Sequence, residues 1–234
     1  MAVLCIAGVS PGIGKTAVAE MLLGHLAGWD VARVRVADEI PEAQAPRLGD
    51  AGHALLSHPD ETEADLELDR LLAAGAASAR VLLAEPRCLA AGLDDLAHSV
   101  PQGGSLLVEG NAYLWAAEAD LAIMVVGPGP SGKGLARVQR SARELFSKIG
   151  IWVWNTRTNP TDEGFFDFPQ DLTRMGFGAA VTNQADFHHV NPARPDDPAG
   201  EPFLDAVRGR LETEWIRRGS DEFLRRIGFK ANEP

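Results

Sequence analysis

Residues 2–16 read Ala2-Val3-Leu4-Cys5-Ile6-Ala7-Gly8-Val9-Ser10-Pro11-Gly12-Ile13-Gly14-Lys15-Thr16, a continuous apolar run that leads into a glycine-rich turn. A short apolar run of this kind is typical of a strand that is buried on both faces of a sheet. Over residues 16–27 apolar side chains recur at helical spacing, so the turn is predicted to connect a strand to a helix. Backbone amides that converge in such a turn, together with the positive end of the helix dipole, bind phosphate groups.

The end of the turn carries side chains that suit a nucleoside triphosphate with Mg²⁺. Lys15 would reach the outer phosphates, and the hydroxyl of Thr16 would ligate the metal. The residues expected to contact the nucleotide here are Ser10, Gly12, Ile13, Gly14, Lys15, Thr16 and Ala17. The plain pattern G-x-x-x-x-G-K-[ST] has four residues between its glycines, whereas five residues separate Gly8 from Gly14. With the plain spacing the first glycine would stand at position 9, which Val9 occupies. An ordinary Gly/Pro turn is the alternative interpretation.

The length and net charge of the chain limit the classes of protein to which it can belong. At 234 residues we expect a single nucleotide-binding domain over residues 1–234. The 22 Lys and Arg are outnumbered by 33 Asp and Glu, a formal charge of −11. A charge of this sign repels nucleic acid and anionic lipid, so we expect neither as a partner. There is no basic leader, no apolar run of about 20 residues and no cysteine spacing for a metal, so a cytoplasmic location is expected.

Strand-like and helix-like segments alternate along the chain, which predicts an α/β fold with an open parallel sheet flanked by helices. After the first strand, strands are expected at 31–36, 81–84, 105–108, 121–126, 151–154 and, weakly, 179–181. Helices are expected at 66–77, 89–98 and 135–149, and loops at 38–59 and 156–169. Residues 191–234 are predicted to form a proline-rich linker and a C-terminal helical segment, with one helix or a pair of helices over 204–227 that packs on the domain or serves a partner.

A magnesium site needs a further oxygen ligand near the ends of the strands. Glu109 directly follows an apolar strand, at the sheet edge where ligands of open α/β sheets gather. We therefore expect Glu109 to ligate the metal and, with Lys15, to take part in catalysis. Asp38 and Asp50 are weaker candidates for a ligand from the loop, and spacing does not choose between them. A solvated acid is the alternative interpretation of each carboxylate.

Asn155 ends another apolar strand, at a point where a nucleotide base commonly lies. Guanine-specific P-loop proteins carry Asn-Lys-x-Asp there, because the carboxylate accepts hydrogen bonds from guanine. Thr158 stands in place of that aspartate. An amide alone can pair with N6 and N7 of adenine, so ATP is favoured over GTP. A capping or turn asparagine is the alternative.

These motifs together resemble dethiobiotin synthetase and its relatives, over the chain up to about residue 185. The family's Gly-Thr-Asp-Thr-x-x-Gly-Lys-Thr has the same gap as Gly8 to Gly14, and its Val-Glu-Gly-Ala-Gly-Gly is similar to the run from Val108 to Tyr113. The loop around Asp50 resembles the one that supplies the family's other metal-binding aspartate.

The resemblance implies a homodimer that binds Mg·ATP, with the substrate at the subunit interface. It implies that Lys15 and Thr16 serve phosphate and metal, that Asp50 and Glu109 complete the metal site, and that Asn155 contacts adenine. The activity it implies is that of an ATP-dependent ligase or phosphoryl transferase acting on a small carboxylate or carbamate. A regulatory or accessory ATPase, of the kind that matures cofactors or metal centres and controls a partner, is the alternative.

The chain departs from the family pattern in its substrate half. Ser10 replaces the family's aspartate in the phosphate loop, and the Lys-Pro after the second strand is absent. Asn111 and Tyr113 replace small glycines and are expected to fill or reshape the substrate pocket. We therefore expect a substrate other than that of the biotin pathway enzyme.

Overall fold

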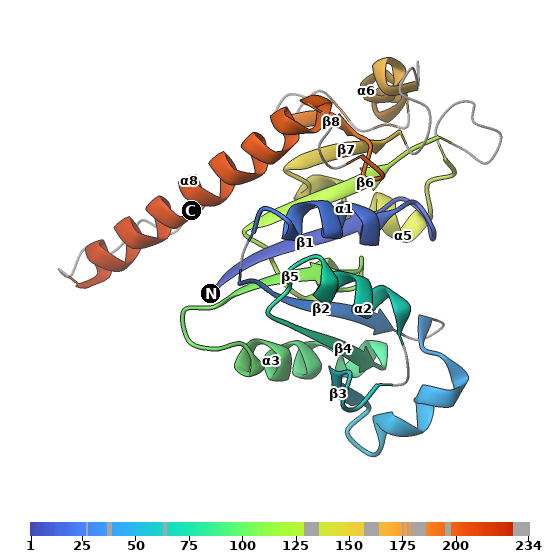
Figure 1. The fold of residues 1–234 in the computed structure, drawn as a ribbon, viewed down its shortest axis with the longest axis vertical. Helices are drawn as coiled ribbons and strands as arrows, with labels where there is room; N and C mark the ends of the chain where they lie inside the picture. The colour runs from blue at the N-terminus through green and yellow to red at the C-terminus, as the bar shows by residue number, and fades with distance from the viewer. Residues whose placement is uncertain are drawn as a thin grey trace.

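The structure is a computed structural model that describes residues 1–26, 28–36, 39–62, 65–128, 136–156, 164–174, 176, 178, 186–194 and 198–226. Within these residues, eight strands form one sheet in the order β3-β4-β2-β5-β1-β6-β7-β8, as Figure 1 shows. Their bounds are β1 Ala2–Gly8, β2 Asp30–Val36, β3 His53–His58, β4 Ser78–Ala84, β5 Ser105–Glu109, β6 Leu121–Val126, β7 Ile151–Asn155 and β8 Asp186–Val190. Neighbouring strands pair in parallel except β3, which runs antiparallel to β4 at one edge. The predicted α/β class is confirmed.

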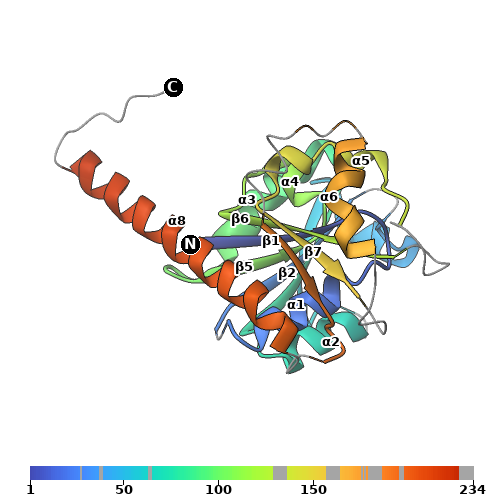
Figure 2. The same ribbon diagram turned by 90° about the horizontal axis from the view of Figure 1, so that it is seen from above.

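Helices cover both faces of the sheet, because a parallel sheet buries both of its faces. Figure 2 shows α3, α4, α5 and α6 on one side and α1 and α2 on the other. The bounds of the helices are α1 Lys15–Leu23, α2 Leu66–Ala73, α3 Leu89–Ser99, α4 Tyr113–Ala116, α5 Arg140–Arg143, α6 Gly164–Arg174 and α8 Glu201–Arg226. Short 3-10 segments are η2 Glu42–Leu48, η3 Pro86–Cys88, η4 Phe146–Lys148 and η5 Pro198–Gly200.

The centre of the sheet explains the continuous apolar runs of the sequence. Strands β1, β6 and β7 are buried along their whole length. Because parallel strands end at the same edge, Gly8, Glu109 and Asn155 come to that edge from β1, β5 and β7. The register aligns Glu109 with Ile6 of β1 and with Arg33 of β2.

The structure corrects two expectations for the middle of the chain. The region 38–59, predicted to be a loop, contains β3 and η2. The single helix predicted over 135–149 is wrong in its described part, which forms only α5 and η4. The residues before α5 are instead tied to the end of β6, where Ala136 N donates to Gly127 O at 2.9 Å, and to the phosphate loop, where Gln139 N donates to Val9 O at 2.9 Å.

Two further differences lie near the far edge of the sheet. Helix α6 begins inside the predicted loop 156–169. The strand expected at 179–181 lies outside the described residues, and the last described strand is β8, which pairs in parallel with β7. Residue His189 of β8 is exposed, as edge strands allow, so this strand lacks the continuous apolar run of the central ones.

Helix α8 confirms the predicted C-terminal helix and starts a few residues earlier. Phe203 and Val207 are buried against the body. Farther along, the guanidinium of Arg218 donates to Met1 O at 2.7 Å and forms an ion pair with Asp120. Figures 1 and 2 show the helix extending away from the sheet toward its C-terminal end. The division into a core and a C-terminal segment over 191–234 stays a prediction.

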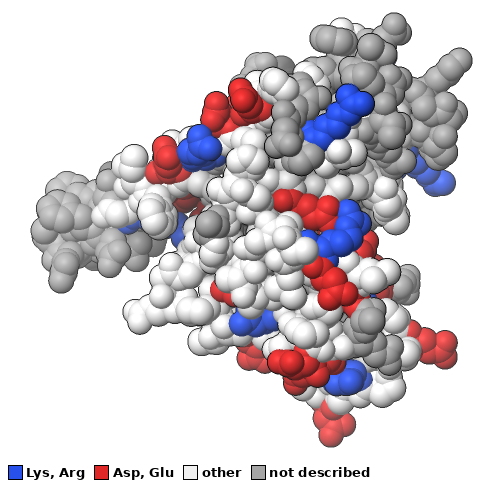
Figure 3. Space-filling view, in the orientation of Figure 1, with Lys and Arg blue, Asp and Glu red and all other residues white. Residues whose placement is uncertain are grey.

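Acidic and basic side chains share the surface. On the face drawn in Figure 3, the basic side chains lie among acidic ones. Among the described residues, no helix is both long and apolar enough to cross a membrane.

Candidate functional site: a cavity at the phosphate loop

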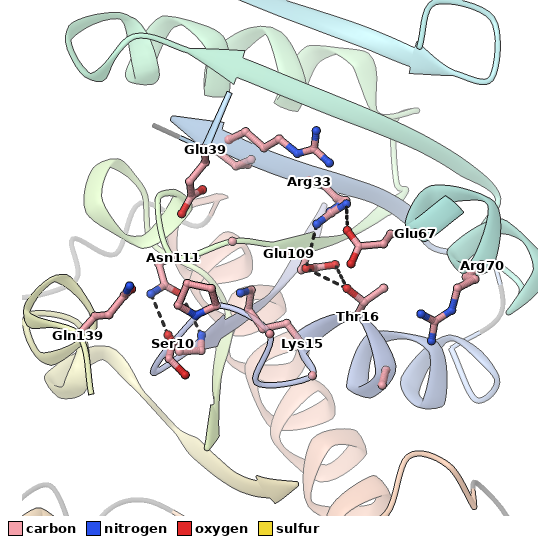
Figure 4. A pocket seen from close by; sticks show the side chains of 18 of the residues that line it. Ser10, Lys15, Thr16, Arg33, Glu39, Glu67, Arg70, Glu109, Asn111 and Gln139 are labelled. Atoms are coloured by element: carbon pink, nitrogen blue, oxygen red, sulfur yellow. Dashed lines mark hydrogen bonds and ion pairs between the residues drawn. The ribbon is translucent and has the colours of Figure 1, made fainter. Parts of the chain in front are cut away.

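A cavity of about 570 Å³ opens at the carboxyl edge of the sheet, where β1 passes into α1. Figure 4 shows side chains from the phosphate loop, β2, α2 and the turn after β5 around it. Its lining comprises Gly8, Ser10, Pro11, Gly12, Gly14, Lys15, Thr16, Ala17, Arg33, Val34, Arg35, Glu39, Pro41, Glu67, Arg70, Glu109, Gly110, Asn111 and Gln139. All the predicted loop contacts except Ile13, which is buried beneath the loop, line this cavity.

The phosphate loop needs glycine at two positions. Gly14 has φ 101°, and a Cβ built on it would lie 2.1 Å from Nδ2 of Asn155. A Cβ on Gly8 would lie 2.7 Å from Cγ2 of Ile13. A side chain at either position would therefore displace Asn155 or Ile13, so this loop conformation requires glycine at both.

Lys15 is the first residue of α1 and lines the cavity. Within the described part of the chain its ammonium has neither a hydrogen bond nor an ion pair, whereas Arg33, Arg35 and Arg70 each pair with a carboxylate. Lys15 is thus the cation that can meet an incoming anion without first breaking a contact.

Thr16 and Glu109, predicted from separate segments, are brought together. The Thr16 hydroxyl lies 3.1 Å from Oε1 and 3.0 Å from Oε2 of Glu109, and the two residues are only 8% and 4% exposed. Hydroxyl and carboxylate oxygens are ligands that Mg²⁺ prefers, and Mg²⁺ takes the rest of its shell from phosphates and water. The Thr16–Glu109 donor pair fits a metal that takes its other ligands from a nucleotide. The described residues contain no cluster of three His, Cys, Asp or Glu.

Arg33 of β2 is a partner of this pair that the sequence pattern did not identify. Its Nη2 lies 3.6 Å from Oε1 of Glu109, and its Nη1 pairs with Glu67 and lies 3.5 Å from Oδ1 of Asp65. Asp65 also caps α2, accepting from the backbone N–H groups of Glu67 and Leu68. Arg33 therefore connects the expected metal ligand to the start of α2.

Asn111 is held by the phosphate loop rather than projecting as a free group into a substrate pocket. Its Oδ1 accepts from Gly8 N at 2.8 Å and its Nδ2 donates to Gly8 O at 2.9 Å. Tyr113 does not line this cavity: it is 7% exposed, and its hydroxyl donates to Glu118 O at 3.3 Å. Burial raises the pKa of Tyr113 to about 12, so the phenol stays neutral. The expectation is that both side chains fill or reshape the pocket; Tyr113 does not fill it, and a reshaping of the pocket stays a prediction.

Asn155 lies beneath the loop, only 4% exposed, and its Nδ2 donates to Ile13 O at 3.0 Å. Its contact with adenine stays a prediction. Asp50 is exposed, lies just before the outermost strand β3 and does not line the cavity, so the structure does not bring it to Thr16 and Glu109. Asp38, the other loop candidate, lies outside the described residues.

Cys5 lies in β1 under the site but is not a reactive group. Its Sγ donates to Gly110 O at 3.6 Å, and burial raises the pKa of the thiol far above its ordinary value. A thiol held neutral in this way is neither a nucleophile nor a metal ligand.

Comparisons with known proteins find similarity to solved structures only. No family model matches the chain, and no curated protein matches it. Similar structures include a chain of the MinC:MinD cell division protein complex of Aquifex aeolicus, with 12% identity, 94% of this chain and 96% of that chain covered, and a TM-score of 0.42. The MinD cell division protein of the same organism has 14% identity, coverage of 94% and 98%, and a TM-score of 0.39. A de novo designed protein with a P-loop NTPase fold has 10% identity, coverage of 92% and 94%, and a TM-score of 0.32.

None of these three structures is a dethiobiotin synthetase, so the specific resemblance to that family stays a prediction. At such identities and TM-scores the similarity says nothing about activity. The functional proposal therefore rests on the geometry of the cavity.

Proposed function

We propose that the chain binds Mg·ATP in this cavity and transfers the γ-phosphoryl group from it. The observation that carries the proposal is the buried Thr16–Glu109 pair beside Lys15, whose ammonium has no partner in the described part of the chain. An oxygen donor pair at a helix N-terminus and a free lysine are the groups that a Mg·nucleotide requires of a phosphate loop.

The roles follow from the chemistry of each group. Loop amides and Lys15 would hold the phosphates and stabilise charge on the outer ones, and Thr16 and Glu109 would hold the metal. Bound Mg²⁺ would supply charge neutralisation on the transferring phosphoryl group. Because Asp50 does not line the cavity, we base the metal site on Thr16 and Glu109 alone. Asn155 is proposed to favour adenine.

The acceptor of the phosphoryl group separates two candidate functions. By resemblance, the first is an ATP-dependent ligase or phosphoryl transferase that acts on a small carboxylate or carbamate, in a homodimer. The second is a regulatory or accessory ATPase whose nucleotide state controls a partner. One observation favours the second: Arg33, Arg35 and Arg70, the cations beyond Lys15 that line the cavity, are already paired with carboxylates of the protein.

Calorimetric titration with Mg·ATP tests the nucleotide site. Lys15→Ala should weaken binding by about 2–4 kcal/mol, the size of a lost charge-assisted contact. The fold should persist, because Lys15 has no partner in the described structure to lose. Gln139→Ala is the matched control, since this exposed side chain lines the same cavity without a hydrogen bond in the described region. Unchanged ATP affinity in Lys15→Ala would remove the assignment.

Phosphate release measured with and without acceptors separates the two functions. A ligase or transferase should turn ATP over slowly alone and several-fold faster with its small amine or carboxylate, with bicarbonate where a carbamate is needed. A regulatory ATPase should show no stimulation by any such compound. Stimulation by a small acid would contradict the second function, and its absence across the screen would contradict the first.

A further inference from the structure

Asn111, in the turn after β5, contacts Gly8 at the start of the phosphate loop, although the two residues are far apart in the sequence. Gly8 N donates to its Oδ1 at 2.8 Å, and its Nδ2 donates to Gly8 O at 2.9 Å. The side-chain amide of Asn111 thus pairs with both the N–H and the C=O group of Gly8. The turn after β5 is thereby tied to the start of the phosphate loop, as Figure 4 shows.

The turn that presents Asn111 is itself fixed. Gly110 has φ 140°, and a Cβ on it would lie 2.7 Å from Val34 O. Its backbone N–H donates to Ile6 O at 3.1 Å. Because only glycine fits between β2 and the turn, the position of Asn111 is set by backbone packing rather than by its own contacts.

Gly8, the residue that Asn111 holds, lies against the stem of Lys15. A Cβ on Gly8 would lie 3.0 Å from Cγ and 3.1 Å from Cδ of Lys15. The ammonium at the end of this stem has three donors, and Lys15 has no hydrogen bond or ion pair in the described residues. Contacts of its stem, such as the one with Gly8, therefore bear on where the ammonium lies.

We propose that Asn111 is a positioning residue for phosphate binding, which fixes the backbone of Gly8 and so holds the stem of Lys15 in place for the nucleotide. This inference rests on the proposed function. In the absence of the amide, the N–H and C=O groups of Gly8 lose these partners, and the backbone against which the Lys15 stem lies is no longer fixed from the turn after β5. The nucleotide would then have to order the loop and the Lys15 stem on binding, which lowers its affinity.

A double-mutant cycle tests whether Asn111 acts through Lys15. ATP affinity is measured by calorimetry, with Mg²⁺ present, for the native protein, Asn111→Ala, Lys15→Ala and the double variant. Asn111→Ala alone should weaken ATP binding about tenfold, equivalent to about 1.4 kcal/mol. In the Lys15→Ala background the same change should weaken it less than threefold, because residues that act as a unit are not additive. Gln139→Ala should change affinity little in either background.

The outcomes separate this inference from the function on which it rests. Equal losses from Asn111→Ala in both backgrounds, or no loss in either, overturn the positioning role while leaving the nucleotide site intact. An unchanged ATP affinity in Lys15→Ala overturns the nucleotide site itself. Thermal melting checks folding, and if Asn111→Ala does not fold, Asn111→Ser is taken through the same cycle with the same expected difference between backgrounds.

Discussion

At the scale of single residues, two glycines of the phosphate loop share a backbone conformation but differ in the room they leave for a side chain. Gly12 and Gly14 both have positive φ, at 66° and 101°. They differ in surroundings, because a Cβ on Gly12 meets nothing within 4 Å, whereas a Cβ on Gly14 meets the amide of Asn155 at 2.1 Å. Gly14 and Asn155 therefore act as one unit that fixes the loop on the end of β7.

This difference predicts unequal effects of alanine at the two glycines. Each substitution introduces left-handed backbone strain of about 1–3 kcal/mol. Gly14→Ala adds a collision that displaces the Asn155 amide from Ile13 O, so it should lower the free energy of unfolding more than Gly12→Ala does. Urea unfolding of the nucleotide-free variants measures both. Equal losses would show that Asn155 moves aside without consequence.

The choice of base is a second prediction at this scale. The native protein should bind ATP more tightly than GTP, because Asn155 can pair with adenine and no aspartate stands at 158. Asn155→Ala should weaken both nucleotides, by about 1–3 kcal/mol, since it leaves Ile13 O unpaired. Only the ratio of the two affinities reports on the base, and it should move toward one. Tighter GTP than ATP binding by the native chain would refute the base contact.

At the scale of elements, the sequence predicts what is local and misses what depends on pairing between distant segments. The central strands are recognisable because burial on both faces requires continuous apolar residues. The edge strands β3 and β8 are partly exposed and carry histidines, so their pattern is weak. In the site, Lys15 and Thr16 follow from spacing within one turn. Arg33 and the Asn111–Gly8 contact depend on the register of β1, β2 and β5, which no local pattern encodes.

The ion pair between Arg33 of β2 and Glu109 of β5 predicts that replacing Arg33 changes the Mg²⁺ concentration needed for ATP binding. Arg33 lies 3.6 Å from Glu109, so its positive charge opposes a metal ion at the same carboxylate. Unit charges about 4 Å apart near a protein surface interact by roughly 4 kcal/mol. Even partial relief should let Arg33→Gln bind ATP at about tenfold lower Mg²⁺ than the native protein. Titrating Mg²⁺ at fixed ATP and reading nucleotide binding measures this.

Arg35→Gln is the matched control for that titration. Arg35 lies two residues along the same strand and pairs with Asp65 at 2.9 Å, and no contact between it and Glu109 is present. Both variants remove one charge and one contact to Asp65, so long-range effects are shared. A higher Mg²⁺ requirement in Arg33→Gln, or equal shifts in both variants, would contradict competition at Glu109.

At the scale of the whole molecule, the expected homodimer requires a surface on which a second copy of the chain can pack. Helix α8 carries Trp215 and Ile216, which are 68% and 71% exposed. Sedimentation should give twice the chain mass of 25.0 kDa if the dimer implied by the family resemblance forms. A monomer at micromolar concentration would contradict it and would favour a partner-controlled ATPase.

The whole cavity also predicts that the protein is not an efficient dethiobiotin synthetase. That reaction must hold a diamine carbamate beside the γ-phosphate, so two anions meet and extra cations are needed. The family places a lysine after its second strand. Here Glu39 lines the cavity beyond β2, and Arg33 and Arg35 are paired with Asp65.

Turnover of diaminopelargonate with bicarbonate and Mg·ATP should therefore be slow. Losing one preorganised cation at a reacting phosphate lowers the rate on the order of a hundredfold. Arg35 could move toward a substrate only by giving up Asp65, and its planar guanidinium does not reproduce the point charge of a lysine. Detection of the cyclic urea by mass spectrometry measures the reaction, with ADP formation as the internal control for an active nucleotide site. Rapid formation of the urea would mean that these ion pairs open when substrate binds, and that the cavity supplies the second cation after all.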